Sequence, residues 1–258
     1  MKKKLVTGAL LLAFGAVAVT GGTLAYFTDE DEAVNVMTTG KVNIIQNEKN
    51  RYGGDYEQNQ ALMPMVDNRT VDAEGEKAPI VVDGYFNPNM NNVVDKIVTV
   101  TNEGEKGAIN QDAYVRTILA FETSAEYEEG TDKVLRDART IFDTYIGVLG
   151  NGLTWMDGTV TIDGQEYVIA YKVYADPLAP GNTTDPSLKQ IFLSPDADNE
   201  VALLFGSEYT ILALSQGTQT TGFDSAEEAL NEAFGILDGE GAVDDATLIS
   251  WLSACAVA

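Results

Sequence analysis

The chain has 258 residues, 16 of them basic and 40 acidic, which gives a net charge of −24 near neutral pH. This charge argues against nucleic acid or an anionic membrane surface as a partner, because like charges repel. The sequence contains no histidine, which excludes histidine-dependent nucleophilic catalysis and the H-E-x-x-H zinc site. Its single cysteine, Cys255, excludes an intramolecular disulfide. We expect Cys255 to be either a small apolar residue near a helix end or an intermolecular link.

The first 25 residues have the layout of a secretory signal peptide. Three lysines at positions 2–4 form a basic start, and an apolar run follows to about residue 19. Thr23 and Ala25 then place small residues at −3 and −1 of a cleavage site. We therefore expect residues 1–25 to be removed, which leaves Tyr26 as the new N-terminus. The alternative is that the apolar run, which is about long enough to span a bilayer, stays as an uncleaved anchor.

The next part of the chain combines a strand pattern with a long polar segment. Between residues 33 and 45 the side chains of Val34 and Val36 share one parity with the apolar residues that follow, which is the period of a half-buried strand. The segment is expected to form one strand or two short strands broken at Gly40. Residues 46–79 are polar with few apolar anchors, so they are expected to form a long loop, and such loops in compact domains are commonly functional.

Further strand signals recur along the rest of the chain. They lie at 80–82, 93–101, 114–122, 159–162, 165–174, 191–193, 201–205 and 209–215. Asp163-Gly164 separates two of them, and this dipeptide favours a two-residue type I′ turn because both positions accept positive φ. Short strands punctuated by Asn, Asp, Gly and Pro predict a mainly β protein. We expect residues 26–258 to form one secreted domain, an antiparallel jelly-roll-like β-sandwich.

Two or three helices are expected to be inserted into this sandwich or to follow it. Residues 132–149 have apolar side chains at i, i+3, i+4 and i+7. Asp224 and Glu227 form a capping-box pattern at the start of a second helix. Residues 244–254 carry a third apolar pattern, so residues 222–258 are expected to be the helical C-terminal part.

One acidic string offers oxygen ligands for Ca²⁺. Asp196, Asp198 and Glu200 lie between predicted strands, and hard cations prefer carboxylate oxygens. The string does not match an EF-hand loop, because Val201 stands where glycine is required. A weak calcium site is therefore weighed against an ordinary polar turn, and no other cofactor is expected.

The string GGTLAYFTDEDEAVNVMTTGKVNI resembles the start of TasA/camelysin-type secreted proteins with a SipW-dependent signal peptide. The matching positions are Gly21, Gly22, Thr23, Ala25, Phe27, Asp29 and Gly40. Patches at 94–104, 113–122, 171–184 and 222–235 are also similar to members of this class. The resemblance implies export through a SipW-type signal peptidase, as in Gram-positive secretion, and a place at the cell surface or in a biofilm matrix. Camelysin-type metallopeptidase activity is not carried over, because the sequence offers no zinc site of the usual kind.

The resemblance also implies extracellular fibres, in which the N-terminal strand of one subunit completes the sheet of the next. An open sheet edge satisfies its N–H and C=O groups with another chain's backbone in this way. The predicted assembly strand contains Tyr26, Phe27, Thr28, Asp29, Val34 and Val36. The alternative is that this segment folds back as the first strand of its own sheet.

We therefore expect a secreted structural protein whose partners are further copies of itself and other matrix or cell-surface proteins. Two other classes stay open. A monomeric surface adhesin or glycan-binding module would use loops such as 46–79 and 176–190. A secreted metallopeptidase would need a metal site that the sequence does not display.

Overall fold

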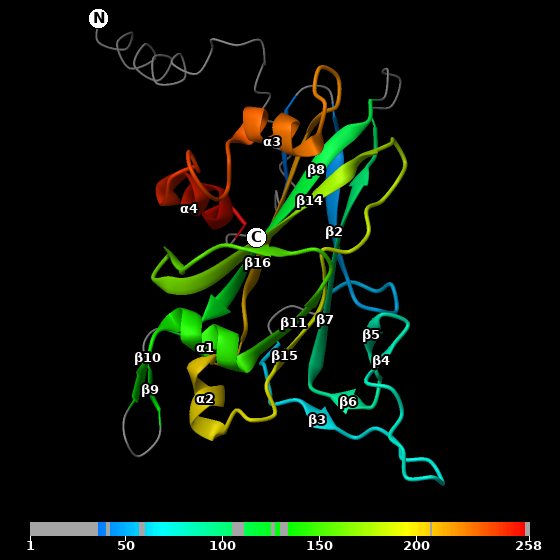
Figure 1. The fold of residues 1–258 in the computed structure, drawn as a ribbon, viewed down its shortest axis with the longest axis vertical. Coiled ribbons are helices and arrows are strands. Elements are labelled where there is room, and N and C mark those ends of the chain that lie inside the picture. The colour runs from blue at the N-terminus through cyan, green and yellow to red at the C-terminus, as the bar shows by residue number, and fades with distance from the viewer. Residues whose placement is uncertain are drawn as a thin grey trace, which may run out of the picture.

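The structure of the protein, a computed structural model, describes residues 36–39, 42–56, 60–104, 111–124, 127–129, 134–206 and 208–255. Two β-sheets that face each other form its centre (Figure 1). The six-stranded sheet consists of β1 (Val36–Thr38), β8 (Ala113–Thr123), β12 (Thr154–Trp155), β13 (Val160–Ile162), β14 (Gln165–Leu178) and β16 (Ile211–Gln219). The four-stranded sheet consists of β2 (Ile44–Lys49), β7 (Val93–Asn102), β11 (Ile146–Gly150) and β15 (Leu188–Leu193). The predicted mainly β class is confirmed.

The strands follow the order β1-β16-β8-β14-β12 in the six-stranded sheet, where β13 also pairs with β14, and β11-β15-β7-β2 in the four-stranded sheet. Within the described ranges, every pair in these two sheets is antiparallel except one, because β1 runs parallel to β16. The strands predicted at 93–101, 114–122 and 165–174 are confirmed as β7, β8 and β14. The segment 33–45 contributes to both sheets, since β1 and the start of β2 lie on either side of Gly40, which is itself outside the described residues.

The predicted hairpin turn at Asp163-Gly164 is confirmed. It joins β13 to β14 with φ values of 51° and 87°, and Ile162 pairs with Gln165 across it. Two positive φ values are what a type I′ turn requires, which explains the aspartate–glycine pair. A second turn with positive φ at both positions, 53° at Asp83 and 79° at Gly84, joins β4 (Val81–Val82) to β5 (Tyr85–Phe86).

The prediction of one long loop at 46–79 is wrong in its first part and incomplete in the rest. β2 continues to Lys49 and pairs with β7 along its whole length. Further on, β3 (Val66–Asp67) pairs with β6 (Met90–Asn91), and Leu62 is buried in the core. The sequence hides β2 because its side chains at Gln46 and Glu48 are polar, although both are hydrogen-bonded inside the fold.

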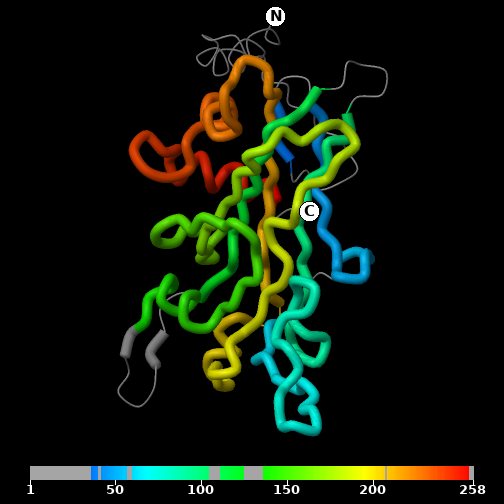
Figure 2. The backbone as a smooth tube through the Cα atoms, turned by 45° about the vertical axis from the view of Figure 1, so that its right-hand side comes forward, coloured from blue at the N-terminus to red at the C-terminus, as the bar shows by residue number. Residues whose placement is uncertain are grey.

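Four helices are present in the part of the chain that the structure describes, one more than the highest number expected. They are α1 (Ala138–Tyr145), α2 (Asn199–Leu204), α3 (Ala226–Phe234) and α4 (Asp245–Ser253). Helices α3 and α4 cover the face of the six-stranded sheet that is turned away from the four-stranded sheet (Figures 1 and 2). The short pairs β3–β6 and β4–β5 lie at the opposite end of the molecule.

The helix predicted over 132–149 is confirmed only in its middle. β10 (Val134–Arg136) pairs with β9 (Tyr127–Glu129) before the helix, and β11 follows directly after Tyr145. The Asp137 side chain accepts a hydrogen bond from the Thr140 N–H and so fixes the start of α1. The end of the predicted helix forms a strand because β11 contains β-branched residues and pairs with its neighbour β15 in the four-stranded sheet.

The strand predicted at 201–205 is also wrong, since this segment lies mainly in helix α2. The Asp198 carboxylate accepts hydrogen bonds from the N–H groups of Glu200 and Val201, which is the arrangement of an N-cap. A short apolar run does not by itself distinguish helix from strand. The cap therefore decides the local structure.

The second helix is confirmed as α3, but its cap lies one residue later than predicted. The Ser225 hydroxyl accepts from the Glu228 N–H, and the Glu228 carboxylate accepts from the Asp224 N–H. Asp224 and Glu227 thus lie one position before the residues that form the cap. The third helix is confirmed as α4, which Asp244 caps through the Thr247 N–H.

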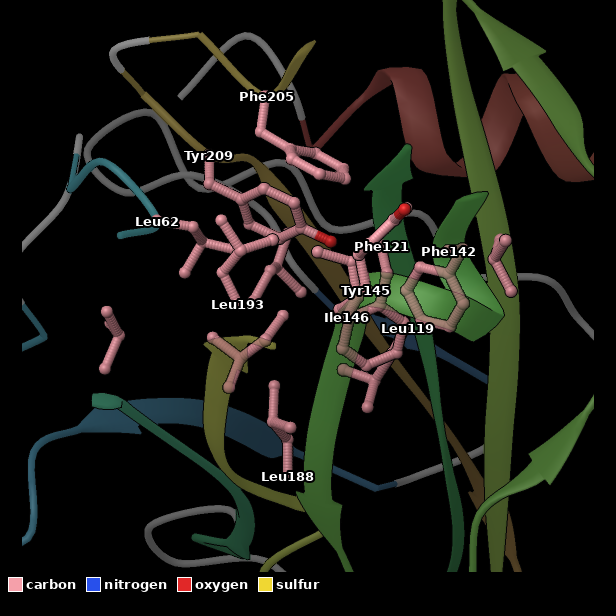
Figure 3. Close-up of a cluster of buried hydrophobic side chains, with 14 of the residues drawn as sticks. Leu62, Leu119, Phe121, Phe142, Tyr145, Ile146, Leu188, Leu193, Phe205 and Tyr209 are labelled. Atoms are coloured by element: carbon pink, nitrogen blue, oxygen red, sulfur yellow. The ribbon is translucent and has the colours of Figure 1, made fainter. Parts of the chain in front are cut away.

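Apolar side chains fill the space between the two sheets in two separate clusters. Figure 3 shows the larger one, which includes Phe121, Phe142, Tyr145, Leu188 and Phe205. The smaller one includes Ile44, Val100 and Val115. Polar side chains at Gln46, Glu48, Lys96, Thr117 and Ser215 also lie on these inner faces, and we refer to them as the polar belt. The two apolar clusters are therefore not continuous along β8, where the belt intervenes.

Candidate functional site

The edge of the six-stranded sheet at β1 is the one part of the predicted assembly site that falls within the described residues. Outside them lie the cleavage positions Thr23, Ala25 and Tyr26 and the assembly residues Phe27, Thr28, Asp29 and Val34. Val36 begins β1, and its side chain packs against the smaller apolar cluster. The predicted assembly strand thus ends in a strand of this chain's own sheet.

β1 is a short end strand held by few bonds. It has three residues, whereas its neighbour β16 has nine, and the register places Thr38 beside Gly217. The Thr39 N–H donates to the Gly217 carbonyl at 2.9 Å, and the Thr39 hydroxyl donates to the Thr218 hydroxyl at 2.9 Å. Most of β16 therefore has no strand beside it on this edge among the described residues.

Next to β1, a side chain closes the outer edge of β16. Backbone groups of alternate residues point away from β8 in an antiparallel pair, and Ala213 shares the parity of Gly217, whose carbonyl binds β1. The Gln46 amide donates to the Ala213 carbonyl at 3.1 Å and accepts from the Ser215 hydroxyl at 2.8 Å. One glutamine of β2 thus satisfies a carbonyl that a neighbouring strand would otherwise satisfy.

A buried ion pair supports this glutamine. The Gln46 amide also donates to Glu48 at 3.1 Å, and Glu48 forms an ion pair with Lys96 of β7. The Lys96 side chain is 4% exposed, and its ammonium group lies 4.1 Å from the centroid of the Tyr56 ring. Because a buried charge is costly without a partner, this pair ties β2 to β7 at the point where Gln46 reaches β16.

The other face of β1 is linked to the helices through a buried arginine. The Gln216 amide donates to the Met37 sulfur at 3.5 Å, and its carbonyl oxygen accepts from Arg116 Nε at 2.6 Å. Arg116 Nη1 donates to the Gly235 carbonyl, at the end of α3, at 3.0 Å. Burial lowers the pKa of Arg116 to about 10, so the side chain stays cationic at neutral pH. The carbonyl end of a helix is a favourable place for a cation.

The structure gives the predicted calcium ligands another role. The Asp198 carboxylate lies 2.9 Å from the backbone nitrogens of Glu200 and Val201 and caps α2. Glu200 lies in the first turn of the helix, where the macrodipole favours an acid. Within the described ranges, no group of three or more Asp, Glu or Cys side chains is placed to hold a metal ion. Asp198 and Glu200 therefore lie at the start of α2, whereas Asp196 lies before it and its N–H donates to the Ser194 hydroxyl.

Cys255 follows Ala254, the C-cap of α4, and packs against the side of the apolar cluster beneath that helix. Its sulfur donates to the Trp251 carbonyl at 3.7 Å. Burial raises the pKa of the Cys255 thiol to about 12, so the thiolate needed for disulfide exchange is scarce at neutral pH. The position fits the first of its two predicted roles, a small apolar residue near a helix end.

Comparison of the chain with protein-family models, curated proteins and solved structures gives no match. Among the described residues, no helix has the length and apolar character that crossing a membrane requires. The roles of the edge residues therefore rest on their geometry alone.

Sequence reasoning missed the polar belt, although the sequence contains a signal for it. On β8, Thr117 stands at an inward position between Val115 and Leu119, and it is fully buried. A polar side chain at an inward position needs a buried partner, and Ser215 supplies it at 3.3 Å. The partner cannot be identified from the sequence, because it lies 98 positions away.

Proposed function

We propose that the protein is a secreted structural protein of the cell surface or biofilm matrix, which assembles by passing its N-terminal strand to the six-stranded sheet of another copy. The observation that supports this most is the pairing of β1, a three-residue end strand beside a nine-residue neighbour. Few contacts have to break to release so short a strand. The same backbone groups can then pair with a strand from another copy.

The outer edge of β16 would offer an incoming strand two carbonyls that are occupied in this structure. They are those of Gly217, bound by the Thr39 N–H, and of Ala213, bound by the Gln46 amide. A strand longer than β1 displaces Gln46 and gains backbone hydrogen bonds along β16. Residues 26–35 precede β1 and supply that length after the proposed cleavage, with Tyr26 and Phe27 as apolar anchors.

We also propose that the two facing sheets form a jelly-roll-like β-sandwich. From β7 onwards the chain passes alternately between the two sheets, from β7 to β8, from β11 to β12 and from β15 to β16. Repeated crossing between two facing sheets is typical of jelly rolls. The parallel pairing of β1 departs from that pattern, and it also means that no tight hairpin ties β1 to β16. A strand without such a turn can come from the same chain or from another copy.

The export step is tested by expressing the full chain in a secreting Gram-positive host that has a SipW-type signal peptidase. Mass spectrometry of the protein released into the medium is expected to give the mass of a chain that starts at Tyr26. A released chain that keeps residues 1–25, or a chain retained in the membrane, would contradict the cleavage.

The assembly step is tested by negative-stain electron microscopy of the released protein over a range of pH and calcium concentration. We expect fibres from the unaltered protein. A variant that lacks residues 26–35 keeps the contacts described for β1, and it is expected to give isolated particles. Leu203→Ser, at a position of α2 that is 78% exposed, is the matched control and is expected to form fibres. Isolated particles of the unaltered protein under every condition would overturn strand exchange and favour a monomeric surface-binding module.

A further inference from the structure

A second surface of the protein carries apolar side chains that the fold does not use. The segment entering the β4–β5 hairpin exposes Ile80, Val81 and Val82 by 49%, 44% and 40%. Tyr52, in the turn that follows β2, is 82% exposed. Single exposed apolar residues need no explanation, but Tyr52 and Val82 come together in the wall of one pocket.

A pocket of about 270 Å³ lies between the Tyr52 turn and this hairpin. Its walls include Arg51, Tyr52, Val82, Asp83, Tyr85 and Phe86. Aromatic and aliphatic side chains form most of this wall, and two side chains with charged groups complete it. Small-molecule sites in proteins commonly have this composition, a mostly apolar hollow with a few polar groups.

Buried polar side chains hold the pocket in one arrangement. Gln190 is fully buried, accepts from the Phe86 N–H at 2.6 Å and donates to Asp95 at 2.7 Å. Asp95 accepts from Arg51 Nε at 2.8 Å, and Arg51 Nη1 donates to the Phe86 carbonyl at 2.9 Å. Burial alone would raise the pKa of Asp95, but hydrogen bonds from Arg51 and Gln190 lower it overall. A surface held in this way loses little freedom when it binds a ligand.

The charges around the pocket favour an uncharged ligand. The guanidinium of Arg51 is balanced by Asp95, and the net charge of −24 repels polyanions. A guanidinium has five N–H donors, and the contacts with Asp95 and Phe86 engage three of its nitrogens. The remaining donors can bind hydroxyl oxygens, and the exposed Asp83 carboxylate can accept from hydroxyl groups.

We propose that this pocket binds a neutral carbohydrate built of equatorially substituted pyranose rings, such as a β-1,4-linked oligomer of glucose or N-acetylglucosamine. Rings of this kind present flat C–H faces, which can stack on the Tyr52 ring and pack against Val82, and peripheral hydroxyls, which can bind Arg51 and Asp83. The hairpin belongs to a different sheet from β1. Binding therefore does not require strand exchange, and a protein that fails to form fibres still binds the sugar.

Saturation-transfer NMR of the purified protein with cellotriose and with chitotriose tests the proposal, followed by calorimetric titration of the probe that gives a signal. We expect binding of at least one probe, and Tyr52→Ala is expected to weaken it about tenfold through the loss of one stacking contact. Tyr52→Phe keeps the ring and is expected to bind as the unaltered protein does. Because Tyr52 is 82% exposed, neither variant is expected to change the Tm, which verifies that the fold is intact.

Leu203→Ala, on α2, is the control for removal of an exposed apolar side chain and is expected to leave binding unchanged. Absence of saturation transfer to both probes would overturn the proposal. So would equal affinities of the unaltered protein and Tyr52→Ala, because the sugar would then lie elsewhere on the surface.

Discussion

Replacing Lys96 by methionine removes the ammonium group that lies between the two sheets and leaves Glu48 without its partner. Breaking a buried ion pair by removing one partner costs about 3–5 kcal/mol. The Glu48 side chain keeps 22% exposure, so water compensates part of this loss and the lower part of the range applies. The contact of the ammonium with Tyr56, at 4.1 Å from the ring centroid, is also lost. We expect the free energy of unfolding to fall by about 3 kcal/mol in Lys96→Met.

Urea unfolding followed by tryptophan fluorescence measures this change, since Trp155 packs against Phe121 and Phe142 in the larger apolar cluster. The midpoint is expected to fall while the m value stays the same, because the surface exposed on unfolding is nearly unchanged. The double variant Lys96→Met/Glu48→Gln leaves no unpaired charge. It is expected to regain a large part of the loss.

A loss smaller than about 1 kcal/mol in Lys96→Met is the value of a solvated surface pair. That result would refute the view that the pair ties β2 to β7. Equal losses in the single and double variants would refute the reasoning in another way. They would place the cost in lost packing and not in the unpaired carboxylate.

Three further predictions concern other parts of the fold. In Gly147→Ala the added Cβ would lie 2.0 Å from the Phe192 ring, so we expect a loss of about 1–3 kcal/mol, measured as a lower Tm. The pKa of Asp95 is lowered in the folded state, so its carboxylate stabilises the fold at pH values above the ordinary pKa of 3.8. This contribution to stability disappears as the pH falls through the lower pKa of the folded state. In urea titrations at pH 7 we therefore expect Asp95→Asn to be less stable than the unaltered protein, and we expect this difference to shrink below about pH 4. A difference that stays constant with pH would contradict the assignment. Ser225→Ala removes the cap of α3 and is expected to cost about 1 kcal/mol, whereas Asp224→Ala is expected to cost less because its side chain does not cap the helix.

The sequence predicts this fold well where side chains alternate strictly between apolar and polar or where a turn needs special residues. Asp163-Gly164 predicts a hairpin by its backbone preference alone, and the apolar composition of β7 and β8 predicts these two strands. The prediction fails where tertiary contacts decide between two local choices. Residues 146–150 continue a helical apolar pattern, yet they form a strand because the neighbouring strand β15 offers them backbone hydrogen bonds in the sheet.

The candidate site is harder to predict than the fold. β2 is hidden by its polar side chains, which are favourable only because distant groups pair with them inside the structure. Gln46 binds backbone and side-chain groups more than 160 positions further along the chain, and no local pattern specifies such a pair. The pocket beside Tyr52 is similar in this respect, since its support comes from Gln190, which belongs to β15.

The distance in sequence between β1 and β16 has a consequence for the order of events during biosynthesis. Thr39 and Thr218, which bond across these two strands, are 179 positions apart, and a chain is made from its N-terminus onwards. The first strand is therefore synthesised long before its partner exists, and pairs this far apart close slowly because of the loop they enclose. During that interval the N-terminal segment is unpaired while older copies of the protein already present a complete β16. The strand exchange proposed above would use this interval, because the edge of an older molecule would then compete with the unfinished one for the same three residues.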